Sequence, residues 1–349
     1  MIFHNQPTIS KDELKAVKQV LESYWIAQGK QVELFETELS RYLGSKNNQA
    51  VAVASGTAAL YLVLIGLGIK ADDEIIVPTY TCSALLNAIF LARATPILVD
   101  INENDLNLDF EKTKNKISKK TKAIIITHTF GQPADLKKFL TLKIPIIEDC
   151  AVALGSKYNG RPVGVFGAAA IFSFYASKVI TAGYGGMIFS KNKKLIAKIR
   201  DYREFDNRKI YYPRFNFQMS DLAAAIGRAQ LKKLSKFLAK RQAIAKIYRH
   251  SISADLIWPK NLAGRKSNCY RLLLKCPSPR IIKKQFLKFG IRTILPIETY
   301  ELLHRYLKQK PSNFPISEKI AKTMISLPIY PNLEDKEVKK IINQLNKIL

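Results

Sequence analysis

The sequence predicts an α/β protein, with a largely parallel central sheet covered by helices on both faces and a smaller α+β domain after it. Three observations support this prediction. Short apolar runs alternate with helix-compatible stretches over the first 240 residues, polar residues follow several of these runs directly, and prolines become frequent further on. Ligands of such sheets bind outside the carboxyl ends of the strands, so we expect the functional site there.

The first elements are expected to be helices, followed by one strand. Ser10-Lys11-Asp12-Glu13 has the pattern of a capping box at the start of a helix, and a second amphipathic helix is expected near 32–43. The apolar run 50–54, the turn residues Ser55-Gly56-Thr57 and the apolar segment 58–67 then predict a strand, a tight turn and a buried helix.

Further apolar runs predict the other strands of the central sheet. They cover residues 74–77, 96–99, 123–127, 144–147, 168–174 and 186–190. Asp100, His128 and the pair Glu148-Asp149 directly follow or end three of these runs. The polar side chains therefore gather at the predicted strand ends.

The C-terminal part is predicted to be a separate, smaller domain. A long basic helix over 222–248 leads into it, short strands are expected at 270–275 and 293–296, and 334–349 has the pattern of a closing amphipathic helix. We place the large domain at residues 1–240 and the small domain at 241–349.

The charge balance is strongly basic, with 56 Lys and Arg against 28 Asp and Glu in 349 residues. Such a balance invites a nucleic-acid partner. The lysines are spread over helical stretches, however, and no recognition helix, zinc finger or aromatic single-strand-binding motif accompanies them. We therefore predict no nucleic-acid partner, and expect the positive surface to attract a phosphate-bearing substrate.

The sequence lacks the patterns of secreted, membrane-spanning and metal-binding proteins. The first thirty residues have no secretory pattern, and no apolar stretch is long enough to cross a bilayer. The four cysteines show no paired spacing, which argues against a disulfide framework or a zinc ribbon. We expect a cytoplasmic protein that binds neither membranes nor metals.

Asp149 and Lys178 are the candidate catalytic pair. Asp149 ends an apolar run, and Lys178 follows 29 residues later, before the glycine-rich stretch Gly183-Tyr184-Gly185-Gly186. Pyridoxal phosphate needs a lysine to hold its aldehyde as a Schiff base and an acid group to keep its pyridine nitrogen protonated. Asp149 and Lys178 suit these two roles.

The cofactor's phosphate also has candidate partners. A phosphate binds well to backbone N–H groups at a helix start with hydroxyls nearby. Gly56, Thr57 and Ala58, together with Ser173, are placed to supply them.

Taken together, the motifs resemble the DegT/StrS family of sugar aminotransferases, which share the aspartate-aminotransferase fold. The resemblance covers nearly the whole chain. The similar segments include Ser55–Leu60, Asp73–Pro78, Ala94–Asp100, His128–Asp135, Glu148–Ala151, Phe172–Lys178, Phe215–Phe217 and Ser326–Pro331.

The resemblance implies an aspartate-aminotransferase-like fold and roles for the site residues. Lys178 would carry pyridoxal phosphate and shuttle protons, and Asp149 would pair with the pyridine nitrogen. Thr57, Ala58 and Ser173 would hold the phosphate. Asn216 would reach it from the other subunit of a homodimer with shared active sites. The implied reaction transfers an amino group, with glutamate as donor, to a nucleotide-linked keto-deoxysugar.

Two departures from the family pattern concern the cofactor. Val152 stands where the family usually has His or Gln in contact with the phenolic oxygen of the cofactor. Cys82 stands where an aromatic ring usually stacks on the cofactor, and Tyr80 would replace that ring only if it faces the same way. These changes indicate a divergent branch with altered cofactor contacts.

Two further departures concern the substrate. Tyr184 replaces a common Glu in the glycine-rich stretch, and Glu298 stands where a substrate-facing His is frequent. We take both as candidate substrate residues. Two alternatives to the main reading stay open: amination of a free cyclitol ketone, and a non-catalytic binding or regulatory protein on the same fold.

Overall fold

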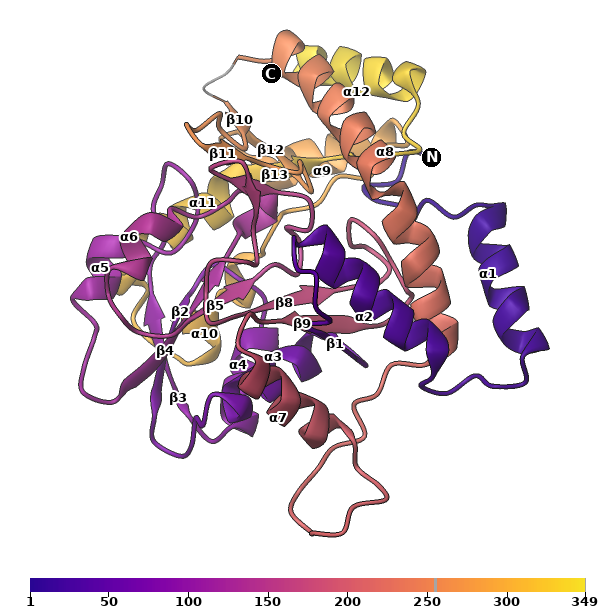
Figure 1. Cartoon of the computed structure of the whole chain (residues 1–349). Helices are drawn as coiled ribbons and strands as arrows, with labels where there is room; N and C mark the ends of the chain where they lie inside the picture. The colour runs from indigo at the N-terminus through magenta and orange to yellow at the C-terminus, as the bar shows by residue number, and fades with distance from the viewer. Residues whose placement is uncertain (254–255, 349) are drawn as a thin grey trace.

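The computed structural model describes residues 1–253 and 256–348, and its centre is a seven-stranded sheet (Figure 1). The strand order is β1-β9-β8-β5-β4-β2-β3. The strands are β1 (Ala50–Val53), β2 (Glu74–Pro78), β3 (Thr95–Val99), β4 (Thr121–Thr127), β5 (Ile146–Asp149), β8 (Ala169–Ser173) and β9 (Gly186–Phe189). β9 runs antiparallel to both of its neighbours, while the other pairs are parallel, so the predicted mostly parallel sheet is confirmed.

Both faces of the sheet are buried, which explains why its strands are continuous apolar runs in the sequence. Along β4, Ile124 and Ile126 belong to one core cluster, and Ala123 and Ile125 belong to the other. The alternation follows from the two-residue period of a strand, which sends successive side chains to opposite faces. The sheet is therefore the wall between two hydrophobic cores.

The helices divide between these two cores. One core takes apolar residues from α2 (Lys30–Tyr42), α6 (Leu136–Leu140) and α8 (Asp221–Ser251). The other takes them from α3 (Gly56–Gly66), α4 (Ala84–Leu91) and α7 (Lys193–Arg203). α1 (Lys11–Glu22) packs along α8, as Figure 1 shows. The short α5 (Phe110–Lys114) is the remaining helix of this part of the chain.

The predicted start of α1 is confirmed in detail. The Ser10 side chain accepts a hydrogen bond from the first turn, and the Ser10 N–H donates to Glu13 Oε2 at 2.8 Å. This reciprocal capping satisfies backbone groups that a helix end leaves open.

The C-terminal part builds its own three-stranded sheet in the order β10-β12-β13. Its strands are β10 (Ile257–Trp258), β12 (Leu272–Lys275) and β13 (Met324–Leu327), and its main helices are α9 (Pro279–Lys288), α10 (Leu303–Tyr306), α11 (Pro315–Thr323) and α12 (Asp335–Ile348). A third small sheet joins β6 (Lys157–Tyr158), β7 (Arg161–Pro162) and β11 (Arg265–Lys266). Short 3-10 turns are η1 (Thr129–Gly131), η2 (Thr299–Glu301) and η3 (Pro311–Asn313).

The strand expected at 293–296 is wrong. This segment makes only an isolated bridge between Ile294 and Ser326. Pro296 has no N–H to continue a ladder, which limits the pairing of the segment. The closing helix is confirmed as α12, although Leu349 lies outside the described residues.

The proposed division between 240 and 241 falls inside α8, which runs without interruption from Asp221 to Ser251. Leu234 and Phe237 of α8 belong to a core of the large sheet, whereas Ile244 and Tyr248 belong to the C-terminal core. We keep domains 1–240 and 241–349 as a proposal, with residues 254, 255 and 349 outside the described chain. Among the described residues, no helix combines the length and apolar character needed to cross a membrane.

Candidate active site

A cavity of about 160 Å³ lies at the carboxyl ends of the parallel strands. Thr127 ends β4 and Asp149 ends β5, and these two residues are paired in register. Cys82, from the loop after β2, also lines the cavity, as does Lys178, from the loop after β8. The cavity is where the strand order predicts a ligand site.

Asp149 is buried, with 8% of its surface exposed. Its Oδ1 accepts a hydrogen bond from the Ala151 N–H at 2.9 Å, and its Oδ2 accepts none from the described residues. Burial raises the pKa of Asp149, and the Ala151 N–H and the positive charge of Lys178 offset only part of this rise. A cationic ring nitrogen beside Asp149 would favour the ionised carboxylate.

Lys178 is held by a compact loop. The loop closes where the Ala182 N–H donates to the Phe174 carbonyl at 2.9 Å, and the Lys178 N–H donates to the Tyr175 carbonyl at 2.9 Å. The N-terminal segment passes beside it, because Asn5 Nδ2 donates to the Ser177 carbonyl at 2.6 Å. Asp149 and Lys178, distant in sequence, thus meet in one cavity.

The start of α3 has the form of a phosphate cradle. Ser55 caps the helix by accepting the Ala58 N–H on its Oγ at 3.1 Å, so the amides of Gly56 and Thr57 remain as the open donors of the first turn. A Cβ on Gly56 would lie 3.0 Å from the Cβ of Ser173, so glycine lets the helix start approach this serine closely. These donors fit a phosphate.

The residues that depart from the family pattern also line the cavity. Cys82 and Val152 both do so, and Tyr80 faces the same cavity, as strand alternation allowed. The Val152 carbonyl accepts a hydrogen bond from Asn268 Nδ2 at 3.0 Å, which fixes this wall of the cavity.

Seven of the predicted residues do not line the cavity of their own chain. Four of them are the phosphate candidates Gly56, Thr57, Ala58 and Ser173, at the start of α3 and the end of β8, and the other three lie elsewhere. Asn216 is exposed on the segment between α7 and α8, which protrudes from the body in Figure 1. Tyr184 is 70% exposed and its ring lies 5.3 Å from the Tyr175 ring. Glu298 caps η2 and forms an ion pair with Arg280 at 3.1 Å.

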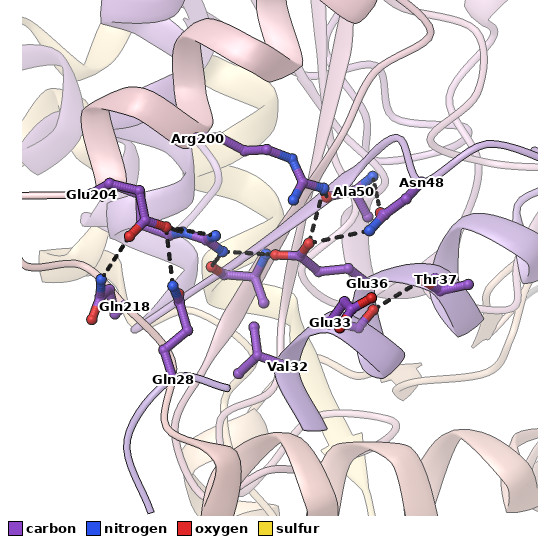
Figure 2. Close-up of polar contacts among 12 residues, drawn as sticks. Gln28, Val32, Glu33, Glu36, Thr37, Asn48, Ala50, Arg200, Glu204 and Gln218 are labelled. Carbon is purple, nitrogen blue, oxygen red and sulfur yellow. Dashed lines mark hydrogen bonds and ion pairs between the residues drawn. The ribbon is translucent and has the colours of Figure 1, made fainter. Parts of the chain in front are cut away.

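The protruding segment is tied to the body by a charged network, drawn in Figure 2. Glu204 accepts hydrogen bonds from Gln28 Nε2 at 3.0 Å and from Gln218 Nε2 at 3.1 Å. Arg203 forms ion pairs with both Glu204 and the buried Glu36. Glu36 forms a second ion pair with Arg200 at 2.9 Å. The network joins the loop before α2 to both ends of the segment that carries Asn216.

Glu148, the neighbour of Asp149, has a structural role. Its oxygens accept the N–H groups of Gly164, Phe166 and Gly167, each at 2.7 Å, and His128 Nε2 lies 3.2 Å away. Burial alone would raise the pKa of Glu148, but these hydrogen bonds hold it below its usual value. Glu148 therefore anchors the 164–167 loop.

Residues outside the sequence prediction complete the cavity, notably Phe130, Tyr270 and Arg271. Arg271 directly precedes β12 in the C-terminal part. Nothing in its local sequence sets it apart from the many other basic residues, and only the packing of the two parts brings it to the cavity.

Comparisons with known proteins identify the family that the whole chain resembles. The model of the DegT/DnrJ/EryC1/StrS aminotransferase family matches residues 7–346. The GDP-perosamine synthase of Vibrio cholerae is 32% identical, with 98% of each sequence covered. The aminotransferase TlmJ from Streptoalloteichus hindustanus superposes with a TM-score of 0.92 at 28% identity, over 99% of this chain and 98% of that one. The PLP form of Spr1654 from Streptococcus pneumoniae gives a TM-score of 0.92 at 25% identity, over 99% of both chains.

Proposed function

The chain belongs to the DegT/DnrJ/EryC1/StrS aminotransferase family, and on that premise we propose that it transfers an amino group from glutamate to a nucleotide-linked keto-deoxysugar with its cofactor carried on Lys178. It is a pyridoxal-phosphate-dependent sugar aminotransferase. The proposal concerns the donor, the acceptor and the residues that do the work.

One observation carries the assignment of the site. Lys178 and Asp149 line a single cavity, and the positive charge of Lys178 lowers the pKa of Asp149, offsetting part of the rise caused by burial. Elsewhere on the surface a lysine is a solvated charge. Here it faces a buried carboxylate at the end of parallel strands, which is the arrangement that a covalently held pyridine cofactor needs.

When bound, pyridoxal phosphate supplies an electron sink that makes the donor's Cα–H bond acidic. The Asp149 carboxylate would hold the proton on the ring nitrogen. Lys178 Nζ would hold the cofactor and move a proton at the substrate carbon. The Gly56 and Thr57 amides and the Ser173 hydroxyl would bind the phosphate, with Ala58 beside them, while Cys82 and Val152 would contact the ring.

Asn216 supports a homodimer with shared sites. Its side chain is exposed, in the segment between α7 and α8, and does not line the cavity of its own chain. We propose that each site receives Asn216 of the partner subunit next to the phosphate. Two large apolar side chains of this segment, Ile210 at 74% exposure and Tyr211 at 91%, are suited to burial between subunits.

The acceptor class rests on the relatives and on charge. A relative 32% identical over nearly the whole chain is a GDP-perosamine synthase, whose name denotes a nucleotide-linked amino sugar product. A net charge of +28 also favours attraction of a nucleotide diphosphate.

The test is spectroscopic. Protein reconstituted with pyridoxal phosphate should show a visible absorption band that borohydride removes and that Lys178→Ala abolishes. Glutamate should bleach the band, and a nucleotide-linked keto-deoxysugar should restore it. A colourless reconstituted protein would refute the assignment of Lys178. If only a free cyclitol ketone restores the band, the acceptor class is the cyclitol and the nucleotide-sugar proposal fails.

A further inference from the structure

Lys178 lies in a loop that depends on other segments for its position. The loop, residues 174–185, joins β8 to β9; all of its residues are described, and none of them belongs to a helix or a strand. Such a loop takes its position from the contacts that neighbouring segments make with it. Two of these contacts involve residues 1–8, which we call the N-terminal strap.

The strap is fixed to the C-terminal part of the chain. Ile2 is buried; its N–H donates to the Gly290 carbonyl at 2.8 Å, and its carbonyl accepts the Arg292 N–H at 2.9 Å. Two residues later, His4 Nε2 and Ser326 Oγ of β13 form a hydrogen bond of 2.8 Å. The beginning of the chain therefore lies against the C-terminal part, as Figure 1 shows, and the next residue is held in a defined place.

Asn5 fixes the peptide unit that directly precedes the Lys178 side chain. Its Nδ2 donates to the Ser177 carbonyl at 2.6 Å. The N–H of the same peptide unit, that of Lys178, donates to the Tyr175 carbonyl at 2.9 Å. A peptide unit is planar, so hydrogen bonds at both of its ends set its orientation. The Lys178 Cα belongs to this plane, and the direction in which its side chain leaves the loop is set with it.

Gln230 of α8 supports the other end of the loop. It is buried, and its Oε1 accepts the Thr181 N–H at 3.4 Å. Its Nε2 donates to the Thr8 carbonyl of the strap at 2.8 Å and to Glu13 Oε1 at 2.7 Å. The strap is thus joined to the loop on both sides of Lys178, directly before it and, through Gln230, after it.

We propose that Asn5 is a positioning residue for Lys178, which places Nζ in the cavity for attachment of the cofactor. This inference rests on the proposed function, because it assumes that Lys178 carries pyridoxal phosphate. Attachment joins Nζ to the aldehyde carbon by a double bond, and the aldehyde oxygen leaves as water with two protons of the amine. Its rate therefore depends on where the loop places Nζ. Asn5 is not among the residues that line the cavity, and it acts through the Ser177 carbonyl.

The test compares two ligands of the apoenzyme that share a pyridine ring and a phosphate. Pyridoxal phosphate attaches to Lys178 and gives the visible band, whereas pyridoxine phosphate has an alcohol in place of the aldehyde and binds without attachment. In Asn5→Ala the band should appear about threefold to tenfold more slowly after mixing, the range expected for one lost hydrogen bond. The Kd of pyridoxine phosphate should stay unchanged. Stopped-flow absorbance and calorimetry measure the two quantities.

Two further variants sharpen the test. Asn5→Asp keeps the shape of the side chain but replaces the donor with oxygens that only accept, so it should slow attachment at least as much as Asn5→Ala. Gln6→Ala is the matched control, because Gln6 is the next carboxamide on the strap, is exposed and has no side-chain hydrogen bond to the described residues.

Hydrogen exchange of the apoenzyme gives a readout that needs no cofactor. The backbone amides of residues 174–185 should exchange about threefold to tenfold faster in Asn5→Ala than in wild type or in Gln6→Ala.

Attachment and loop exchange at wild-type rates in Asn5→Ala and Asn5→Asp would overturn the inference. Equal losses in attachment rate and in pyridoxine phosphate affinity would also overturn it, since Asn5 would then support the whole cavity rather than Lys178. In both cases a wild-type protein that develops its visible band leaves the proposed function intact. A wild-type protein that stays colourless would refute the proposed function, and the role of Asn5 with it.

Discussion

Glu204 Oε2 accepts a hydrogen bond from Gln218 Nε2 at 3.1 Å, which ties together the two ends of the segment that carries Asn216 (Figure 2). The other oxygen of Glu204 accepts from Gln28 and from Arg203. A single carboxylate thus fixes the protruding segment to the loop before α2 and, through Arg203, to the buried Glu36.

Glu204→Ala is predicted to weaken cofactor retention in the dimer. The change removes the brace at the base of the segment, so Asn216 of the partner subunit would be held less firmly beside the phosphate. We expect the dissociation constant of pyridoxal phosphate to rise about fivefold, which corresponds to a lost hydrogen bond of about 1 kcal/mol. Fluorescence titration measures it. Glu22→Ala, at an exposed pair with Lys18, is the control, and equal affinities in both variants would contradict the brace.

Glu148→Gln is predicted to destabilise the fold at neutral pH by about 2–4 kcal/mol, because it removes a buried charge that accepts three backbone N–H groups. The folded-state pKa of Glu148 is below its usual value. Its contribution is therefore present above the unfolded-state pKa and is lost as the pH falls through the folded-state pKa. Urea unfolding at pH 7 and pH 4 should show a smaller gap between wild type and variant at pH 4. The exposed Glu111→Gln is the control, and a gap that widens in acid would be inconsistent with this assignment.

Cys82 is predicted to be the thiol that reports on cofactor binding. It is the exposed one of the four cysteines, and the other three are buried. Desolvation within the cavity and the nearby Asp149 raise the pKa of its thiol, so the reactive thiolate is scarce near neutrality. Iodoacetamide labelling of the apoenzyme should be slow at pH 7 and accelerate above pH 9, and pyridoxal phosphate should suppress it.

Mass spectrometry of the labelled protein locates the modified thiol, and Cys82→Ser should abolish the labelling. Equal labelling of the apoenzyme and the holoenzyme would show that Cys82 does not contact the cofactor.

Asp149→Asn is predicted to separate cofactor attachment from catalysis. An amide cannot keep the ring nitrogen protonated, while Lys178 is untouched. The visible band should persist, and the rate at which glutamate bleaches it should fall by about 100-fold or more. Stopped-flow absorbance measures the rate. A variant that reacts at the wild-type rate would remove Asp149 from the proposed mechanism.

Most of the large domain could be predicted because its signals are local. The capping box at Ser10 and the apolar runs of the strands each predict their structure from residues that are close together in the sequence. The segment 293–296 failed because its apolar residues resemble a strand, whereas its pairing depends on distant residues and on Pro296, which has no N–H to donate.

The candidate site divides in the same way. Asp149 and Lys178 could be predicted because each lies in a motif, and the order and spacing of these motifs along the chain are distinctive. Tyr184 and Glu298 were chosen by position in a motif, yet they lie on the surface and in a helix cap. Arg271 and Tyr270, which line the cavity, escaped notice, since a lone arginine and a lone tyrosine have no local signature.

The sequence by itself determined the α/β class, the candidate site at the strand ends and the candidate pair Asp149 and Lys178, because these depend on periodicity and on residues close to strand termini. The tertiary structure alone decided that Tyr270 and Arg271, from the C-terminal part, line a cavity at the strand ends of the large sheet. Burial and the meeting of distant segments are properties of packing, and no pattern along the chain contains them.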